Sequence, residues 1–464
     1  MDAAGRVEAV LAQVDADIET GLERLKALLR IKSVSTDPAF AGECRRAAAW
    51  LAEQLQALGF EAAARPTPGH PIVIAHSPEQ GGPHVLFYGH YDVQPVDPLA
   101  LWHTDPFEPS VQADSNGRTI IVARGASDDK GQMMTFIEAC RAWKAVTGEL
   151  PVRVSMLLEG EEESGGPSLP GFLTDNAAEL GAADIALVCD TRMWEAQTPS
   201  VITMLRGLVA EEIEITCASR DLHSGLYGNA ARNPNQVLAD IIASLRAPDG
   251  SVAIAGFYDD VDEISPALKA QWAGLGFDAA AFLGSAGLSV PAGEQERSVL
   301  ETLWARPTCE INGMSGGYAG DGFKTVLPAK ASAKISFRLV SRMDPDRVRQ
   351  AFRRHVERHL PADCTVRFTD HGGSPAIVVP DDGLALGRAL QALSQEWGKP
   401  AVITGSGGSI PVVGEFKRLL GLDTLLIGFA RIDNKIHSPN EKYDLDSFHR
   451  GIRSWVRVLA ALAA

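Results

Sequence analysis

The alternation of short apolar runs with helical stretches constrains the fold of this chain more than any other feature. Apolar runs of four to seven residues, bounded by turn residues, are typical of buried strands, and they occupy positions 72–75, 85–88, 152–158, 185–189 and 425–429. Amphipathic stretches separate them, such as 132–145, where Met133, Phe136 and Cys140 share one helical face. This alternation predicts an α/β sheet that helices cover on both faces.

The middle of the chain has a different order. Segment 209–216 alternates like a half-exposed strand, and Asn233-Pro234 supplies the cap and first-turn proline of a helix. A strand pair, a second helix and a last strand follow at 308–312, 331–340, 344–360 and 365–368. This β-α-β-β-α-β order predicts a ferredoxin-like unit. We therefore expect one α/β domain from 1–203 plus 381–464, and a second domain at 204–380 whose insertion, about 248–305, has no predicted structure.

Charge and cysteine usage limit the partners of the chain. It has 464 residues and a formal net charge of -16, so a phosphate backbone or an anionic membrane would repel it on average. The six cysteines are spread singly, as thiols of a reducing compartment are. The first residues lack the basic and apolar regions of a signal peptide, and no apolar run is long enough to span a membrane. We expect a cytoplasmic protein that binds neither nucleic acid nor membrane.

Acids and histidines follow the predicted strands. We expect five strands to deliver them to one edge of the sheet, where α/β proteins bind their ligands. Each residue alone has an ordinary explanation as a solvated loop or a helix cap, but five together favour a metal site. The set lacks thiolates, which suits zinc, manganese or cobalt, and comprises His90, Asp128, Glu163, Asp190 and His437.

Neighbouring acids refine this interpretation. Asp128 lies in a turn before a helix and could bind one metal ion with each carboxylate oxygen. Asp92 stands two residues after His90, where it could accept the second ring proton of that histidine. In the segment 161–163, one glutamate could bind metal while its neighbour acts as a general base.

These segments resemble, in order, those of a dinuclear zinc peptidase family. The family includes carnosinase-type dipeptidases, glutamate carboxypeptidase, aminoacylase and succinyl-diaminopimelate desuccinylase, and the resemblance is nearest to its bacterial dipeptidase branch. The likeness covers nearly the whole chain and rests on the segments 90–95 (HYDVQP), 125–131 (GASDDKG), 161–165 (EEESG), 221–225 (DLHSG) and 437–441 (HSPNE).

The resemblance implies a role for each residue of the predicted metal site. Asp128 bridges two divalent ions, most often zinc, His90 and Asp190 complete one site, and Glu163 and His437 complete the other. Glu162 is the general base acting on a metal-bridging water, and Asp92 supports His90. The resemblance also implies a cis peptide between Asp128 and Asp129, and a mixed-sheet α/β catalytic domain of zinc-peptidase type.

The smaller domain resembles the family's lid and dimerisation domain. His223 corresponds to a histidine that reaches the active site of the partner subunit in a homodimer and stabilises the oxyanion. Arg338 corresponds to an arginine that binds the substrate carboxylate. Gly408 and Ser409 lie in the Gly-Gly-Ser-Ile-Pro loop that contacts the substrate tail. The expected activity is hydrolysis of dipeptides or short peptides.

Two alternatives remain at this point. Dipeptidases of the family commonly have Arg-Glu before that loop, whereas this chain has Gly405-Ser406, which keeps an N-acyl-amino-acid amidohydrolase as an alternative. A catalytically silent binding protein with the same fold is the remote alternative, although such a protein has no need of Glu162 beside a metal ligand.

Overall fold

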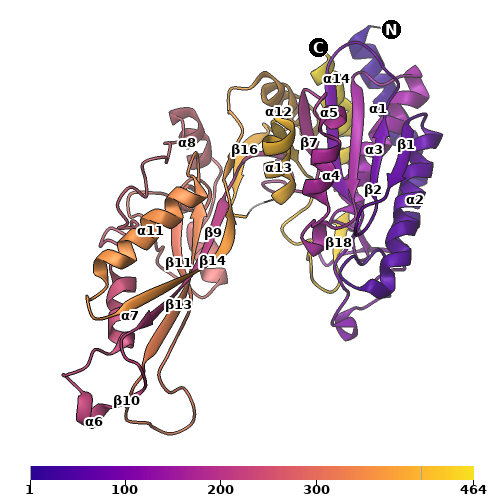
Figure 1. The fold of residues 1–464 in the computed structure, drawn as a ribbon. Helices are drawn as coiled ribbons and strands as arrows, with labels where there is room; N and C mark the ends of the chain where they lie inside the picture. Colours follow the sequence, from indigo (N-terminus) through magenta and orange to yellow (C-terminus); the bar gives the residue numbers. More distant parts are fainter. Residues whose placement is uncertain (1, 409) are drawn as a thin grey trace. The chain divides into compact units, whose positions relative to one another are not determined.

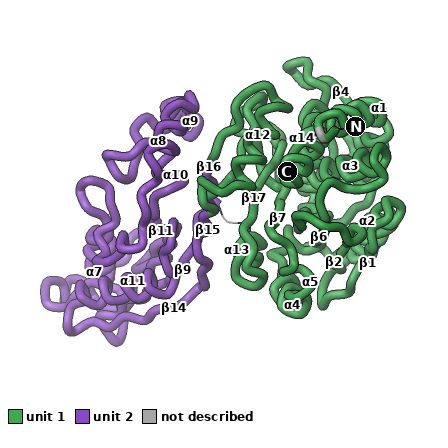
Figure 2. Tube along the Cα trace, turned by 90° about the horizontal axis from the view of Figure 1, so that it is seen from above, with its two compact units in different colours: residues 1–203, 379–404, 411–464 green, residues 204–378, 405–410 purple. Residues whose placement is uncertain are grey.

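The computed structural model describes residues 2–408 and 410–464, which form two compact units. Unit 1 comprises residues 1–203, 379–404 and 411–464, and unit 2 comprises residues 204–378 and 405–410 (Figure 2). Each unit has its own sheet and its own core. No helix in the described part of the chain is long and apolar enough to cross a membrane.

A nine-stranded mixed sheet lies mainly in unit 1 (Figure 1). Its four central strands, in the order β6-β3-β7-β17, pair in parallel and place their carboxyl ends at the same edge. The full order is β1 (Glu61–Arg65), β2 (Ile72–His76), β6 (Arg153–Glu159), β3 (His84–His90), β7 (Ile185–Val188), β17 (Thr424–Ile427), β8 (Ser200–Leu205) and β15 (Ile377–Val378), with β16 (Val402–Ser406) pairing β8.

Two neighbouring aromatic residues of β3 show how both faces of this sheet are covered. Successive side chains of a strand point to opposite faces. Phe87 stacks on Phe136 of α3 (Lys130–Thr147) and meets Trp455 of α14 (Leu445–Ala463), whereas Tyr88 meets Phe416 of the π-helix Phe416–Leu420 edge to face. The predicted α/β sheet covered on both faces is therefore confirmed.

The other helices of unit 1 extend these two layers. On the side of α3 and α14 lie α1 (Ala3–Leu29) and α12 (Leu384–Trp397). Three short helices pack against the π-helix: α4 (Leu169–Asp175), α5 (Ala177–Leu180) and α13 (Pro411–Glu415). The helix α2 (Ala41–Ala57) packs on β1 and β2.

A small three-stranded sheet, β18-β5-β4, corrects one expectation. Asp128 follows β5 (Thr119–Val122), which pairs with β4 (Ser110–Ala113) and β18 (Lys442–Asp444) and not with the large sheet. We expected the five site residues to follow strands of one sheet, and this expectation is wrong for Asp128. The apolar pattern of 119–122 does not show with which strands this segment pairs. The turn that carries Asp128 nevertheless leads directly into α3.

Unit 2 has the predicted β-α-β-β-α-β order. Its antiparallel sheet has the strand order β11 (Thr308–Gly316), β13 (Lys330–Leu339), β9 (Gly207–Thr216) and β14 (Thr365–Ser374). The helices α7 (Pro234–Ala243) and α11 (Pro345–His359) pack on this sheet. The fold class is thus confirmed: a mixed α/β unit with a large sheet and a separate unit with a small antiparallel sheet.

The insertion for which the sequence predicts no structure is helical. It contains α8 (Pro266–Ala273), α9 (Ala279–Ser285) and α10 (Val299–Trp304). Beyond the main sheet of unit 2, β10 (Leu222–His223) pairs with β12 (Val326–Leu327) in a two-stranded ribbon, and α6 (Ser224–Tyr227) follows β10 directly.

One buried position of β9 holds an acid. Residues of β9 alternate between buried and half-buried, and Glu211 occupies a buried position beside Ile213. Arg349 and Arg353 of α11 donate hydrogen bonds of 2.8 to 3.1 Å to its carboxylate. These two fixed positive charges satisfy a carboxylate that would otherwise be costly to bury.

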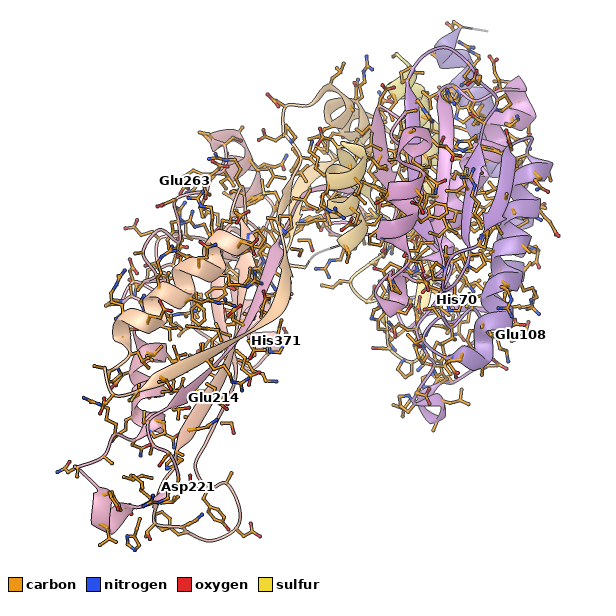
Figure 3. The ribbon with its side chains drawn as sticks, viewed as in Figure 1. His70, Glu108, Glu214, Asp221, Glu263 and His371 are labelled. Carbon is orange, nitrogen blue, oxygen red and sulfur yellow. The ribbon has the colours of Figure 1, made fainter. Side chains whose placement is uncertain are left out.

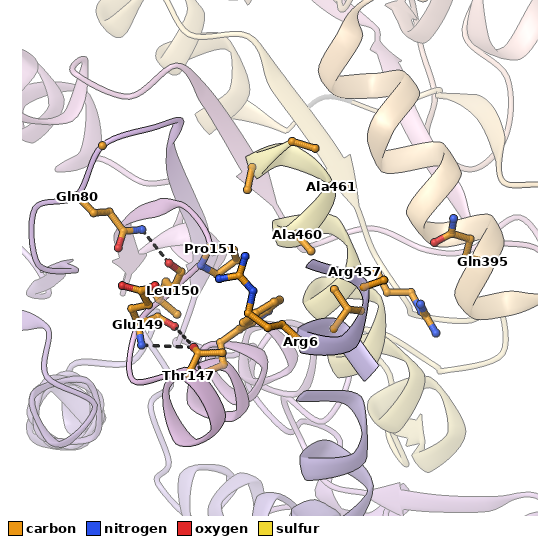
Figure 4. A pocket seen from close by; sticks show the side chains of 16 residues that line it. Arg6, Gln80, Thr147, Glu149, Leu150, Pro151, Gln395, Arg457, Ala460 and Ala461 are labelled. Atoms are coloured by element: carbon orange, nitrogen blue, oxygen red, sulfur yellow. Dashed lines mark hydrogen bonds between the residues drawn. The ribbon is translucent and has the colours of Figure 1, made fainter. Parts of the chain in front are cut away.

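A cavity of about 550 Å³ lies at the edge of the unit 1 sheet opposite to the carboxyl ends of its central parallel strands. Gln80 and Gly81, which precede β3, and residues 149–151, which precede β6, line it together with the ends of α1 and α14 (Figure 4). None of the residues predicted to bind metal lines this cavity.

Candidate metal centre

Five side chains from separate parts of unit 1 converge at the carboxyl edge of the sheet. His90 is the last residue of β3, Asp190 follows β7 and Glu163 lies in a 3-10 turn after β6. Their ligand atoms form two groups, each with its atoms within 4.8 Å of one another, and the groups share Asp128. One group is His90, Asp128 and Asp190, and the other is Asp128, Glu163 and His437.

The two carboxylate oxygens of Asp128 face different histidines. Oδ1 lies 3.0 Å from Nε2 of His90, and Oδ2 lies 2.9 Å from Nε2 of His437. The same ring nitrogens lie 3.8 Å from Asp190 Oδ2 and 3.1 Å from Glu163 Oε2, respectively. Asp128 is therefore positioned as the common member of two three-residue groups.

A buried acid whose role the sequence analysis did not identify fixes the turn that carries Asp128. The Glu441 carboxylate accepts backbone N–H bonds from Gly125, Ser127 and Asp128 at 2.9 to 3.0 Å. Arg124 adds a guanidinium bond of 2.8 Å to it. The peptide bond between Asp128 and Asp129 is cis, as the resemblance implied. Only its place in the segment 437–441 pointed to Glu441.

His90 is held from both sides. Its Nδ1 lies 3.1 Å from the backbone oxygen of Asp92 and 3.4 Å from Asp92 Oδ1, so the backbone carbonyl is the nearer acceptor. Asp92 Oδ2 accepts the backbone N–H of Glu163 at 3.0 Å and so links the two groups. Asp129 Oδ2 accepts the backbone N–H of His90 at 3.1 Å.

Electrostatics distinguish the members of the cluster. Burial raises the pKa of Glu162, partly offset by His90, and the charges of Glu163 and Asp128 raise it further. Burial and the charge of Asp128 raise the pKa of Asp190 well above its usual value. Burial also disfavours ionisation of Asp128, but hydrogen bonds from His437 and His90 keep its pKa below the usual range.

This donor set fits divalent metal ions. No lysine or arginine in the described ranges pairs with Asp92, Asp128, Glu162, Glu163 or Asp190, which together crowd several negative charges into one site. Asp92 Oδ1 is buried without a hydrogen bond. Buried carboxylates of like charge need a cation, and carboxylate oxygens with imidazole nitrogens are common ligands of zinc and related metals.

The remaining predicted site residues lie in unit 2 and belong to neither metal group. His223, at the end of β10, is exposed, and its Nδ1 accepts the backbone N–H of Gly225 at 3.0 Å. A neutral imidazole that accepts at Nδ1 carries its proton on Nε2. His223 is thus a donor at its outer nitrogen.

Arg338 is half-buried in β13, opposite Thr308 and Leu208. It lies close to Arg206, whose pKa is lowered to about 10, first by burial and then by the charge of Arg338. Arg206 donates a 3.1 Å hydrogen bond from Nε to the Gly407 oxygen. The Gly408 N–H donates to Ser406 Oγ at 3.2 Å, and Ser409 lies outside the described residues.

Gly405 stands where dipeptidases of the resembling family commonly have arginine, and a close contact explains why a glycine fits here. A Cβ atom at this position would lie 2.5 Å from Cβ and 2.8 Å from Cγ of Trp304, the last residue of α10. Real Cβ atoms do not approach so closely, so no side chain fits unless Trp304 moves. The helical insertion therefore occupies the space that an arginine at position 405 would need.

Comparison with known proteins agrees with this geometry. Residues 86–461 match the peptidase family M20/M25/M40. The chain is 31% identical to the Cys-Gly metallodipeptidase dug1 of Schizosaccharomyces pombe over 97% of both chains, and 28% identical to the human Beta-Ala-His dipeptidase over 98% of this chain and 93% of that protein. Among solved structures, the M20 family metallo-carboxypeptidase Sso-CP2 of Sulfolobus solfataricus has a TM-score of 0.77 at 30% identity, covering 96% of this chain and 99% of the other.

Proposed function

The chain belongs to the peptidase family M20/M25/M40 and is a metallodipeptidase, and we propose that it hydrolyses dipeptides that carry a free α-carboxylate, of the kind for which its relatives are named, Cys-Gly and Beta-Ala-His. The observation that carries this proposal is Asp128, whose two oxygens face two separate groups of metal-ligating side chains beside Glu162.

His90, Asp128 and Asp190 would hold one divalent ion, and Asp128, Glu163 and His437 a second. Zinc is our proposal for both ions, because three acids and two imidazoles without a thiolate suit it, as they also suit manganese or cobalt. When bound, such ions lower the pKa of water and polarise a carbonyl.

Glu162 is the proposed general base. Its neighbour Glu163 belongs to a metal group. The raised pKa of Glu162 lies nearer to neutral pH, and a carboxyl whose pKa is near the working pH is most effective at both accepting and donating a proton. The carboxylate takes a proton from the attacking water and then donates it to the leaving amide nitrogen. Asp92 keeps His90 and the Glu163 backbone in place during this exchange.

Unit 2 supplies the proposed substrate contacts. His223 can donate from Nε2 to the oxygen on which negative charge develops, and in our proposal it does so in the partner subunit of a homodimer formed through unit 2. Arg338 binds the substrate carboxylate through its planar guanidinium, and the Gly408 backbone contacts the substrate tail. With the predicted domain boundaries, 1–203 plus 381–464 holds the metal groups together with Gly408, and 204–380 holds His223 and Arg338.

Two other substrate classes compete with dipeptides. The likeness to a metallo-carboxypeptidase favours longer peptides as a second candidate, since a carboxypeptidase also requires a free terminal carboxylate. The N-acyl alternative rests on Gly405, and the contact with Trp304 gives that glycine a steric reason that is independent of the substrate. The dipeptidase names of the relatives favour the peptide substrate.

The test compares metal content with a substrate panel. Elemental analysis of the purified chain should find two divalent ions, and turnover of Cys-Gly or β-Ala-His should exceed that of a tripeptide and of N-acetyl amino acids. His223→Ala should lower turnover without changing metal content. Full activity in metal-free protein would contradict the proposal, and preferred cleavage of tripeptides or N-acetyl amino acids would reassign the substrate.

A further inference from the structure

Two cysteines that are far apart in the sequence meet in the sheet of unit 2. Cys217 follows β9 and Cys364 precedes β14, 147 positions apart in the chain, and their Sγ atoms lie 2.7 Å from each other. Thr216 pairs with Thr365 in the antiparallel register, so the two cysteines occupy the next rung of the same ladder.

The hydrogen bonds of this rung define its geometry. The Cys217 N–H donates to the Ala329 oxygen, on the side of β9 away from β14, and the Cys364 N–H donates to the Pro361 oxygen. Cys217 and Cys364 are therefore a non-hydrogen-bonded pair. In such pairs the Cα atoms are about 4.5 Å apart and the side chains share a face, which lies within the range that a disulfide bond requires.

The two thiols of this rung differ in their exposure to solvent. Cys364 is buried in the core of unit 2, whereas Cys217 is only half-buried at the edge of that core. Arg232 and Asp363 form an ion pair beside the two thiols, within unit 2. Cys217 is therefore the more accessible of the two thiols to a small reagent.

We propose that Cys217 and Cys364 are a redox modification site that forms a reversible intramolecular disulfide with low-molecular-weight disulfides of the glutathione type. The Cys217 thiolate attacks one sulfur of the small disulfide, a mixed disulfide forms, and one small thiol leaves. The Cys364 thiolate then attacks the Cys217 sulfur and releases the second small thiol. The protein loses two hydrogen atoms, and one small disulfide is reduced to two thiols.

The thiol chemistry sets the rate and the stability of this bond. Burial, followed by the neighbouring Cys364 thiol, raises the pKa of Cys217 to about 12. Few thiolates exist at neutral pH, so exchange is slow and should speed up about tenfold for each pH unit below this pKa. A thiol of high pKa is also a poor leaving group, so reduction of the disulfide should be slow as well.

The bond would fasten the start of the segment that carries His223. This segment runs from Cys217 to β10, and it pairs with 325–329 through the Asp221 side chain, which accepts the Ala329 N–H at 2.9 Å, and the Ser224 N–H, which donates to the Thr325 oxygen (Asp221 is labelled in Figure 3). A covalent bond at Cys217 would limit how far this segment separates from β14.

The test follows the thiols of the full-length, metal-loaded protein. The protein is incubated with oxidised glutathione or with dithiothreitol, unfolded and alkylated, and its peptides are mapped without reduction. In the oxidised sample, two of the six thiols should escape alkylation, and a peptide linking Cys217 to Cys364 should appear. Because this readout uses the unmodified sequence, it does not depend on the folding of any variant.

Melting curves of matched variants provide the second readout. Oxidised wild type should melt about 5 °C or more above reduced wild type, because the bond closes a long loop. Cys217→Ser, Cys364→Ser and the double variant should all lose this difference, whereas Cys309→Ser, at a buried cysteine of the same unit, should keep it. Six alkylatable thiols after oxidation, a link between other cysteines, or equal melting of both wild-type samples would overturn the proposal.

Discussion

Buried carboxylates in the two units have different kinds of positively charged partner. Glu211 in unit 2 is surrounded by Arg349 and Arg353, whose positive charge is fixed at any physiological pH. Among residues 2–408 and 410–464, the ion pairs of Asp128 in unit 1 are with His90 and His437, and an imidazole is positive only when it binds a proton. The first arrangement is complete within the chain, whereas the second requires cations from outside. Four predictions test this contrast, from the largest expected free energy to the smallest.

Glu162→Gln should have the largest effect, and it should be on turnover alone. Loss of the proposed base should lower kcat by about 10³-fold, roughly 4 kcal/mol, because a glutamine cannot take up a proton. Metal content and melting temperature should stay at the wild-type values, since the amide keeps the shape of the side chain. Steady-state kinetics with elemental analysis measures both. Glu149→Gln, at an exposed acid beside the cavity of Figure 4, is the matched control and should be silent.

Glu211→Ala should affect stability instead. It removes the buried carboxylate to which both Arg349 and Arg353 bond, and Arg349 keeps its more exposed partners Asp346 and Asp370, so the free energy of unfolding should fall by about 3 kcal/mol. Denaturant unfolding of the metal-loaded protein measures this loss. Metal content should not change. Glu214→Ala, three residues along β9 at a more exposed pair with Lys330 (Glu214 is labelled in Figure 3), should cost less than about 1 kcal/mol. An equal loss in both variants would contradict the contrast.

Glu441→Gln should weaken metal binding without removing a ligand. The amide group cannot accept the N–H bonds on both of its sides, so the turn that presents Asp128 should loosen. Apparent metal affinity should fall between about 10-fold and 100-fold, as it does when a hydrogen-bonding partner of a metal ligand is lost. Competition with a fluorescent chelator measures the change. Unchanged affinity would show that the turn holds its shape without Glu441.

The smallest effect concerns Glu159, which is buried beneath the metal cluster with one hydrogen bond from the Tyr88 hydroxyl. Burial raises the pKa of Glu159 from 4.5 to about 8. A carboxyl whose pKa is raised by folding contributes its full stability below pH 4.5 and loses it as the pH rises to about 8.

Glu159→Gln should therefore be more stable than wild type at pH 8, by at least about 1 kcal/mol, which is the value of a shift of one pKa unit, and should lose this advantage near pH 5. Melting curves at several pH values measure the difference. Parallel pH profiles of the two proteins would argue against the raised pKa.

The sequence predicted the parts of this molecule that depend on local pattern. Apolar runs and helix caps predicted the central strands and the order of unit 2, because burial periodicity and capping are properties of neighbouring residues. The structure also brings His90, Asp128, Glu163, Asp190 and His437 together, which the motifs led us to expect.

Features that depend on distant pairing could not be predicted in this way. The partners of β5, the contact between Gly405 and Trp304, and the meeting of Cys217 with Cys364 join segments far apart in the chain. Glu441 was not identified for the same reason, since its bonds run to a turn 313 to 317 positions earlier.

That last separation has a consequence for synthesis. The ribosome makes the chain from its N-terminus, so Asp128 emerges long before Glu441 and His437 do. All of unit 2 is translated in between. Until unit 2 has been translated, the turn of Asp128 therefore lacks the Glu441 carboxylate and the group of Asp128 and Glu163 lacks His437. Translation order thus separates the synthesis of the clustered acids from that of the two residues that complete their surroundings.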